Sequence, residues 1–251
     1  MGPPHAARPR DRWFLSFDCA TKSFAFALLR VRDPDPRIVP KAEALAAAVR
    51  AGDAPGGLAI AQEMDAETRG YLHLAAGGAV DLVPGKKDND IPTVERIGAA
   101  IAYLRGTVAC ALAAARADGC PPPDSPDLNV AVEFQMGPNA PARTIAVVLL
   151  TYFSDANTFM VGPAYKNKLW YPSRPDLRHC FFVERYSSLY TANKNHSKEL
   201  YFDHLAPTFG HDRGGALEGV PARLRKDFAD CVTQVLGFLA YGDLEKAAEK
   251  F

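Results

Sequence analysis

The most informative part of the sequence for the fold is the stretch Trp13-Phe-Leu-Ser-Phe-Asp18-Cys-Ala-Thr-Lys-Ser23-Phe-Ala-Phe-Ala-Leu-Leu-Arg-Val31. Its two halves, 13–18 and 24–31, are short runs rich in aromatic and aliphatic residues, which is typical of β-strands. Only the five residues 19–23 separate them, and that is the length of a hairpin connection. We therefore expect the chain to open on a β-hairpin whose first strand ends at a carboxylate, Asp18.

Helical and extended patterns alternate in the rest of the chain. Apolar residues from Ile97 to Leu112 recur at spacings of three and four, which predicts a long helix that begins near Asp90 and Pro92. The run 130–134 is mostly apolar and lies between two helical patterns, as expected of a central parallel strand. These patterns predict an α/β fold with a mixed sheet. The further elements that we expect are strands at 71–75 and 158–161 and helices at 141–153, 195–205 and 222–241.

Composition excludes several classes of protein. The chain has 29 basic and 29 acidic residues among 251 and no net charge, so it does not coat nucleic acid by bulk charge. Its five cysteines are scattered without a CxxC motif, which indicates neither a disulfide framework nor a zinc site and favours a reducing intracellular compartment. No uninterrupted apolar run reaches the length of a membrane span, and we expect no association with a membrane.

Charge is unevenly distributed along the chain. The segment 163–202 has a net charge of +4 with interleaved aromatic residues, a pattern that suits phosphate contacts and base stacking. An aromatic mini-core under a basic surface would give the same pattern. The segment 33–95 has a net charge of −5 and is a poor candidate for a phosphate-binding face. We expect flexible tails at 1–12 and 242–251 and an irregular, insert-like region at 33–90.

Four acidic residues stand out by their positions in the predicted elements. Asp18 ends the first strand, Glu133 lies in an otherwise apolar strand, and Asp227 and Asp230 are three apart on the last helix. Each has a simple structural explanation: a turn cap, an ion pair with Arg143, or solvated helix surface. Together, however, converging carboxylates repel one another unless cations compensate. Oxygen ligands of this kind suit a pair of Mg²⁺ ions, which can clamp the attacking and leaving oxygens of phosphoryl transfer.

The order strand–Asp, hairpin, strand–Glu, helix–Asp-x-x-Asp resembles that of the ribonuclease-H-like nucleases. It is most similar to the RuvC-type Holliday junction resolvases, including their poxvirus and large-DNA-virus branch. The resemblance covers most of 13–241 and implies one ribonuclease-H-like domain with a mixed sheet flanked by helices. The segments that carry it are Phe14-Leu-Ser-Phe-Asp18-Cys-Ala-Thr-Lys-Ser23, Val130-Ala-Val-Glu133-Phe-Gln, Val161-Gly-Pro-Ala-Tyr-Lys166-Asn-Lys168, Asn195-His-Ser-Lys198-Glu-Leu and Arg225-Lys-Asp227-Phe-Ala-Asp230-Cys-Val.

The resemblance implies a Mg²⁺-dependent endonuclease that cuts four-way DNA junctions, with Mn²⁺ as a substitute metal. Asp18 would bridge two metal ions, Glu133 would bind one of them, and Asp227 and Asp230 would complete the site. Lysines near these motifs are candidates for DNA phosphate contacts, although solvated surface is the simpler explanation of each. They are Lys22, Lys166, Lys168, Lys198 and Lys226.

Two further expectations follow from the resemblance. Symmetric nicking requires two active sites, so we expect a homodimer, with the helix 141–153 as the first choice for its contact. Burial of that helix in the core of one subunit is the alternative. The family usually has glycine two residues after the first Asp, where this chain has Ala20. Either the backbone approaches a phosphate less closely here, or the hairpin uses ordinary dihedral angles.

Two other functions remain open from the sequence. An actin-like ATPase or sugar kinase also opens on strand–Asp–turn–strand, but the glycine pairs of this chain do not fit the phosphate and adenosine loops of those proteins. An inactive junction-binding protein is the second alternative, and retention of all four acids argues against it. We expect an intracellular protein, located at the site of viral DNA replication in the host cell if the chain is viral.

Overall fold

The opening hairpin forms as predicted. The computed structural model describes residues 11–32, 72–85, 91–134, 139–163 and 220–241, together with Tyr165 and scattered positions between 44 and 59. Strand β1 (Asp11–Cys19) is followed directly by β2 (Ser23–Arg32). The amide of Ala20 donates a hydrogen bond of 3.0 Å to the carbonyl of Ser23, which closes the turn. Among the described residues only glycines have positive φ, so Ala20 sits in a hairpin with ordinary dihedral angles.

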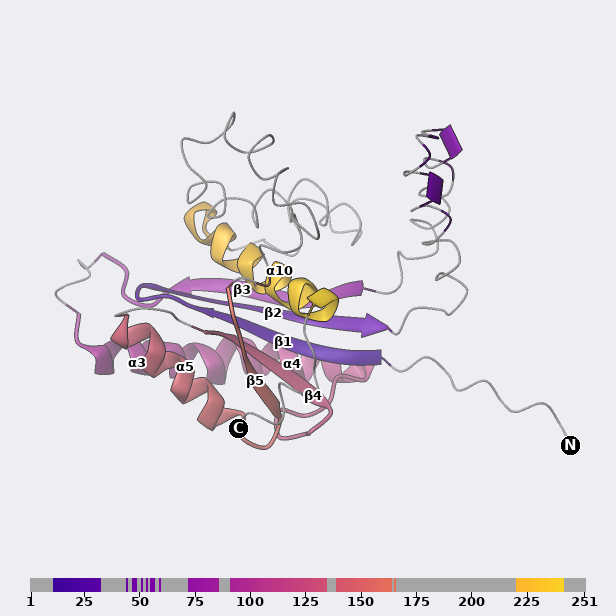
Figure 1. The fold of residues 1–251 in the computed structure, drawn as a ribbon. Coiled ribbons are helices and arrows are strands. Elements are labelled where there is room, and N and C mark those ends of the chain that lie inside the picture. The colour runs from indigo at the N-terminus through magenta and orange to yellow at the C-terminus, as the bar shows by residue number, and fades with distance from the viewer. Residues whose placement is uncertain are drawn as a thin grey trace, which may run out of the picture. The chain divides into compact units, whose positions relative to one another are not determined.

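The sheet has five strands in the order β3-β2-β1-β4-β5. Strand β4 pairs in parallel with β1 on one side and with β5 on the other, while the arrows of β1, β2 and β3 alternate in direction (Figure 1). All six residues of β4 are buried, as expected for a central strand. The prediction of a mixed sheet flanked by helices is confirmed. The remaining strands are β3 (Leu72–Asp81), β4 (Leu128–Glu133) and β5 (Asn157–Val161).

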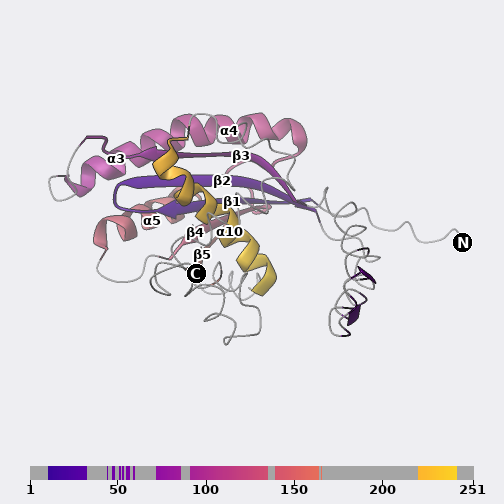
Figure 2. The ribbon, with the colours of Figure 1, turned by 90° about the horizontal axis from the view of Figure 1, so that it is seen from above.

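Helices cover both faces of the sheet. The helical segment α3–η2–α4–η3 and helix α5 lie on one face, and α10 lies on the other (Figures 1 and 2). The side chain of Asn139 accepts a hydrogen bond from the amide of Ala142 and caps α5. The helices are α3 (Thr93–Tyr103), the π-helical turn η2 (Leu104–Val108), α4 (Ala109–Ala115), the 3₁₀ turn η3 (Arg116–Asp118), α5 (Ala140–Tyr152), the 3₁₀ turn η6 (Ala222–Leu224) and α10 (Arg225–Tyr241).

The long helical segment packs by the stripe that its sequence predicts. By length and composition alone, Thr93–Asp118 is apolar enough to cross a membrane. Its residues Leu104, Val108 and Leu112 belong to the hydrophobic core, and core helices of folded domains pass the same test. The helix begins after Pro92, and the predicted cap Asp90 lies outside the described residues.

The hydrophobic core lies between the sheet and the layer of α3, α4 and α5. The β1 residues Leu15 and Phe17 point into it, and the ring of Phe17 lies 5.7 Å from that of Phe153 at the end of α5. Helix α5 contributes Ile145 and Leu149, which are fully buried. These two side chains therefore pack inside one subunit, as the alternative has it, and a dimer contact through the rest of the helix 141–153 stays a prediction.

The chain divides into two compact units, 1–12 with 30–73 and 13–29 with 74–251. All four candidate acids belong to the second unit. Three predicted features lie outside the described residues: the helix 195–205, the basic segment 163–202 except Pro163 and Tyr165, and the lysines Lys166, Lys168 and Lys198. The predicted domain bounds, 13–241 with tails at 1–12 and 242–251, stay predictions.

Candidate active site

Asp18 and Glu133 stand side by side on neighbouring parallel strands. The register pairs Phe17 with Val132, so the next row of the sheet pairs Asp18 with Glu133, about 4.8 Å apart along the hydrogen-bonding direction. Side chains alternate along a strand. Because Phe17 and Val132 point into the core, both carboxylates lie on the opposite face. Asp18 is 6% exposed and Glu133 is 7% exposed.

Helix α10 crosses that face diagonally and brings the second pair of acids. Its first turns lie over β3, where a Cβ at Gly77 would overlap the ring of Phe228. Its far end lies over β5, where Phe238 stacks on Phe159 with ring centroids 4.6 Å apart. Between them the backbone of Asp18 forms a hydrogen bond with the thiol of Cys231. Figure 2 shows this crossing.

This crossing determines where the acids of α10 lie. Asp230 precedes Cys231 and is 8% exposed, so it lies against the end of β1, while Asp227 is half-buried one turn earlier. Just before the helix, Arg223 forms a salt bridge of 2.7 Å with Asp81 at the end of β3. Asp18, Glu133 and Asp230 are therefore all buried on the α10 face of the sheet, with Asp227 one turn earlier on the helix.

The nearby acids affect the pKa values of two cysteine thiols. Burial raises the pKa of Cys19 well above its usual value, and the nearby charges of Asp18 and Glu133 raise it further. Burial likewise raises the pKa of Cys231, with added contributions from Asp18 and Asp230. Both thiols are therefore neutral at physiological pH.

The carboxylates fit a divalent metal by their chemistry. Carboxylate oxygen is the ligand that Mg²⁺ prefers, and Mg²⁺ commonly uses one or two protein carboxylates together with waters and substrate phosphates. Within the part of the chain that the structure describes, no three His, Cys, Asp or Glu side chains are grouped closely enough to hold a metal ion. This set of donors supports two carboxylates for each metal ion, with phosphate and water as the other ligands.

The turn after Asp18 is held by contacts that the sequence patterns do not predict. Arg96 of α3 is 4% exposed, and its Nη1 donates a hydrogen bond of 2.6 Å to the carbonyl of Thr21. The amide of Leu82 donates a hydrogen bond of 2.7 Å to the carbonyl of Lys22. A signal for Arg96 was present in the sequence, because it continues the buried stripe of Ala100 and Leu104 at intervals of four.

Of the predicted phosphate-binding lysines, the structure describes two. Lys22 lies in the hairpin turn after Asp18, and Lys226 precedes Asp227 in the first turn of α10; both are half-buried. Each is thus close in sequence to a site acid. The other three lysines lie outside the described residues.

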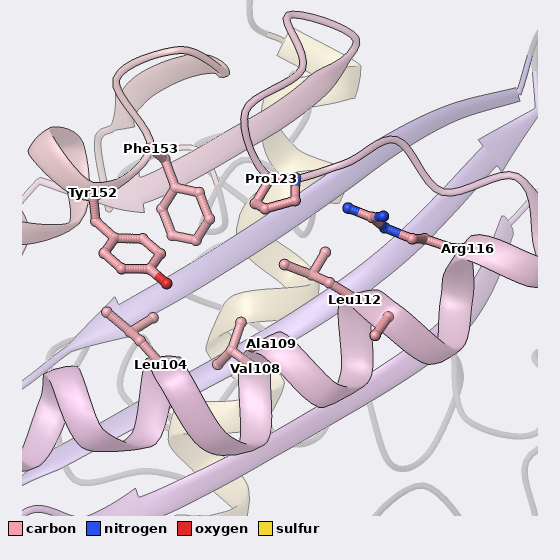
Figure 3. A pocket seen from close by; sticks show the side chains of 9 residues that line it. Leu104, Val108, Ala109, Leu112, Arg116, Pro123, Tyr152 and Phe153 are labelled. Atoms are coloured by element: carbon pink, nitrogen blue, oxygen red, sulfur yellow. The ribbon is translucent and has the colours of Figure 1, made fainter.

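A half-open pocket of about 220 Å³ lies on the other side of the sheet and does not include the acids. Figure 3 shows the side chains of the helical segment and of Tyr152 and Phe153 around it. Its lining is mainly apolar, with Arg116 at one end. The pocket therefore offers no carboxylate chemistry.

Two solved structures are similar to this chain. RuvC of Thermus thermophilus has 11% identity and a TM-score of 0.42, covering 92% of this chain and 96% of its own. T. thermophilus RuvC in complex with Holliday junction substrate has 11% identity and a TM-score of 0.40, covering 91% and 94%. No family model and no curated protein matches the chain. Likeness at this level says nothing of activity, so the function has to be inferred from the chain's own residues.

Proposed function

We propose that this protein is a structure-specific endonuclease that resolves four-way (Holliday) DNA junctions by metal-dependent hydrolysis of phosphodiester bonds. The observation that carries the proposal is the burial of Asp18, Glu133 and Asp230, each less than a tenth exposed, on the α10 face of the sheet. Carboxylates buried near one another are unfavourable unless cations compensate their charge. The order of these acids along the chain, which resembles that of RuvC-type resolvases, supports a junction as the substrate.

Each acid has a part in this proposal. Asp18 would be a ligand at both metal sites, Glu133 would be a ligand at one of them, and Asp227 with Asp230 would complete the set from α10. Bound Mg²⁺ would supply an activated water and stabilise the leaving 3′ oxygen, and Mn²⁺ takes the same ligands. The strands and the crossing helix hold the carboxylates in place. Lys22, four residues after Asp18, and Lys226, next to Asp227, would contact DNA phosphates in this proposal.

The remaining parts of the proposal rest on the resemblance in motif order. A four-way junction has two equivalent strands to cut, so the active form is a homodimer. Membership of the large-DNA-virus branch, and a location at the site of viral DNA replication, are parts of the same proposal. Localisation of the tagged protein in infected cells tests them.

Cleavage of a synthetic four-way DNA junction with Mg²⁺ tests the function. We expect symmetric nicks from the wild type and a loss of about 10²–10³-fold or more in Asp18→Asn and Asp227→Asn, the range found when one transition-state stabiliser is removed. Junction binding should persist in both variants, because the amide keeps the size of the carboxyl group. Asp155→Asn is the matched control. Because Asp155 is exposed in the turn after α5, this variant should cleave the junction as the wild type does.

The outcomes separate the alternatives. Tight junction binding without cleavage by the wild type would favour an inactive binding protein. Neither binding nor cleavage, with ATP binding instead, would favour the ATPase or kinase. Cleavage that survives Asp18→Asn would contradict the proposed site, because Asp18 is central to it.

A further inference from the structure

Two buried polar side chains behind the acidic cluster have no hydrogen-bond partner. Ser16 is fully buried, and its Oγ is unpartnered. Gln234 is 1% exposed, and neither its Nε2 nor its Oε1 has a partner. Buried polar side-chain atoms in folded proteins are nearly always satisfied, so an unpartnered pair next to a candidate site calls for an explanation.

Both side chains belong to the face that carries the acids. Ser16 precedes Asp18 by two residues and therefore points to the same side of β1. On α10, Gln234 follows Asp230 by four residues and Asp227 by seven, so the three share one stripe of the helix. Ser16 and Gln234 thus continue the two elements that supply the acids, one step further from the end of β1.

The path of α10 brings the two together. The row of the sheet at Ser16 runs through Ala131 to Phe159. Helix α10 meets Asp18 at Cys231 and meets Phe159 at Phe238. Gln234 lies between those two contacts along the helix. The helix therefore places it over the row of Ser16, further from the C-terminal end of β1 than the carboxylates.

Other buried polar groups nearby are satisfied. Thr233 is fully buried and donates a hydrogen bond of 2.9 Å to the carbonyl of Ala229. Asn129, two rows further back than Ser16 on the neighbouring strand, donates to the carbonyl of Trp13 and accepts from Asn157. Apart from Ser16 and Gln234, the unpartnered buried side-chain atoms among the described residues are arginine Nε atoms.

We propose that Ser16 and Gln234 are positioning residues for the metal-binding carboxylates, an inference that rests on the proposed metal-dependent function. A carboxylate has about four lone-pair positions, and a metal ion uses only one or two of them. The hydroxyl of Ser16 and the amide N–H of Gln234 supply donors for the rest. One buried water, held by these three polar atoms, would connect them to Asp18 and Asp230. These bonds fix the side-chain rotamers of the two ligands.

Mn²⁺ binding to the full-length protein without DNA, measured by isothermal titration calorimetry, tests this inference. We expect Gln234→Met and Ser16→Ala to weaken Mn²⁺ binding about 10–100-fold, the usual effect of losing a group that orients a metal ligand. Gln234→Met keeps the size of the side chain, so the variant should fold, and its melting temperature checks this. The matched control is Thr233→Val, which removes a satisfied hydroxyl next to Gln234 and should bind Mn²⁺ as the wild type does.

The result that overturns the inference is wild-type Mn²⁺ affinity in both variants, whatever the cleavage assay gives. Ser16→Ala removes one oxygen atom and decides the question if Gln234→Met does not fold. Absence of Mn²⁺ binding by the wild type would also overturn it. Mn²⁺ binding that weakens in both variants, in a protein that does not cut junctions, would support the inference and contradict the proposed function.

Discussion

At the residue scale, the two neutral thiols beside the acids give the fold a defined response to pH. The pKa values of Cys19 and Cys231 are raised in the folded protein, first by burial and then by the nearby carboxylates. In the unfolded chain both thiols ionise near the ordinary pKa of 9.0. Above that pH the unfolded state therefore holds fewer protons than the folded state, and stability must fall as pH rises.

We expect the free energy of unfolding in urea to be insensitive to these thiols below about pH 8. Between about pH 9 and pH 10 it should decline by up to about 1.4 kcal/mol per pH unit for each thiol. Tyr103, whose pKa burial raises to about 12, adds to the decline only at higher pH. Cys231→Ala should flatten this slope, whereas Cys110→Ala, at an exposed thiol, should keep it. An identical slope in the two variants would contradict this account of Cys231.

At the scale of elements, Arg96 connects α3 to the turn that follows Asp18. Its guanidinium is buried and donates to the carbonyls of Thr21 and Ile91. Arg96→Met should lower the free energy of unfolding by about 1.5–3 kcal/mol, the usual value of a hydrogen bond to a charged group. It should also reduce cleavage, because the turn is no longer held.

Urea unfolding measures this effect, and the same helical segment offers the control. Arg105 is exposed in η2, so Arg105→Met should change stability by less than about 0.5 kcal/mol. Equal stability of the two variants would show that the contact between Arg96 and the turn contributes nothing.

Gly77 lets α10 lie close to β3. A Cβ at this position would overlap the ring of Phe228, so Gly77→Ala should destabilise the fold by about 1–3 kcal/mol and displace the acids of α10. A matched glycine lies in α3, where a Cβ at Gly98 meets open space. Gly98→Ala should instead stabilise the protein by about 0.5–1 kcal/mol. Thermal unfolding and Mn²⁺ binding of the two variants test the pair, and a neutral Gly77→Ala would refute the close contact.

The same glycines explain where prediction from the sequence stopped short. A strand was predicted at 71–75, but β3 runs over Leu72–Asp81. Its second half contains Gly77 and Gly78, which have low strand propensity. Each glycine makes room for an aromatic ring from one helical layer, Phe228 on one face and Tyr103 on the other. Tertiary packing outweighs local propensity here, and a single sequence does not show that packing.

The positions of the four acids in their elements follow from local sequence patterns, whereas the contacts of the residues around them do not. Asp18 and Glu133 end apolar strands, and Asp227 and Asp230 share a helix face, so each acid stands in a pattern that can be recognised locally. Their meeting depends on the strand order, which places β4 beside β1, and on the diagonal path of α10. Arg96 and Gln234 were missed because a polar residue on a buried stripe gains meaning only when its neighbours in space are known.

At the scale of the whole molecule, the proposed activity requires two active sites on one junction, and one subunit has only one set of the four acids. The acids lie on the α10 face of the sheet, while α5 lies on the other face (Figure 1). In α5, the side chains of Ile145 and Leu149 are buried in the core. Val147 is 55% exposed and Tyr152 is 43% exposed. A contact between subunits through these exposed residues would leave both acidic sites free to reach DNA.

Light scattering should therefore give a mass near twice 27.2 kDa for the wild type. Val147→Glu should shift the mass toward the monomer without lowering the melting temperature, because the side chain is exposed and a charge there opposes only an apolar contact between subunits. The matched control is Val94→Glu at the start of α3, where Val94 is 74% exposed, and this variant should stay a dimer. A wild type that remains monomeric even with a four-way junction bound would contradict paired cutting, because two symmetric nicks need two acidic sites on one junction.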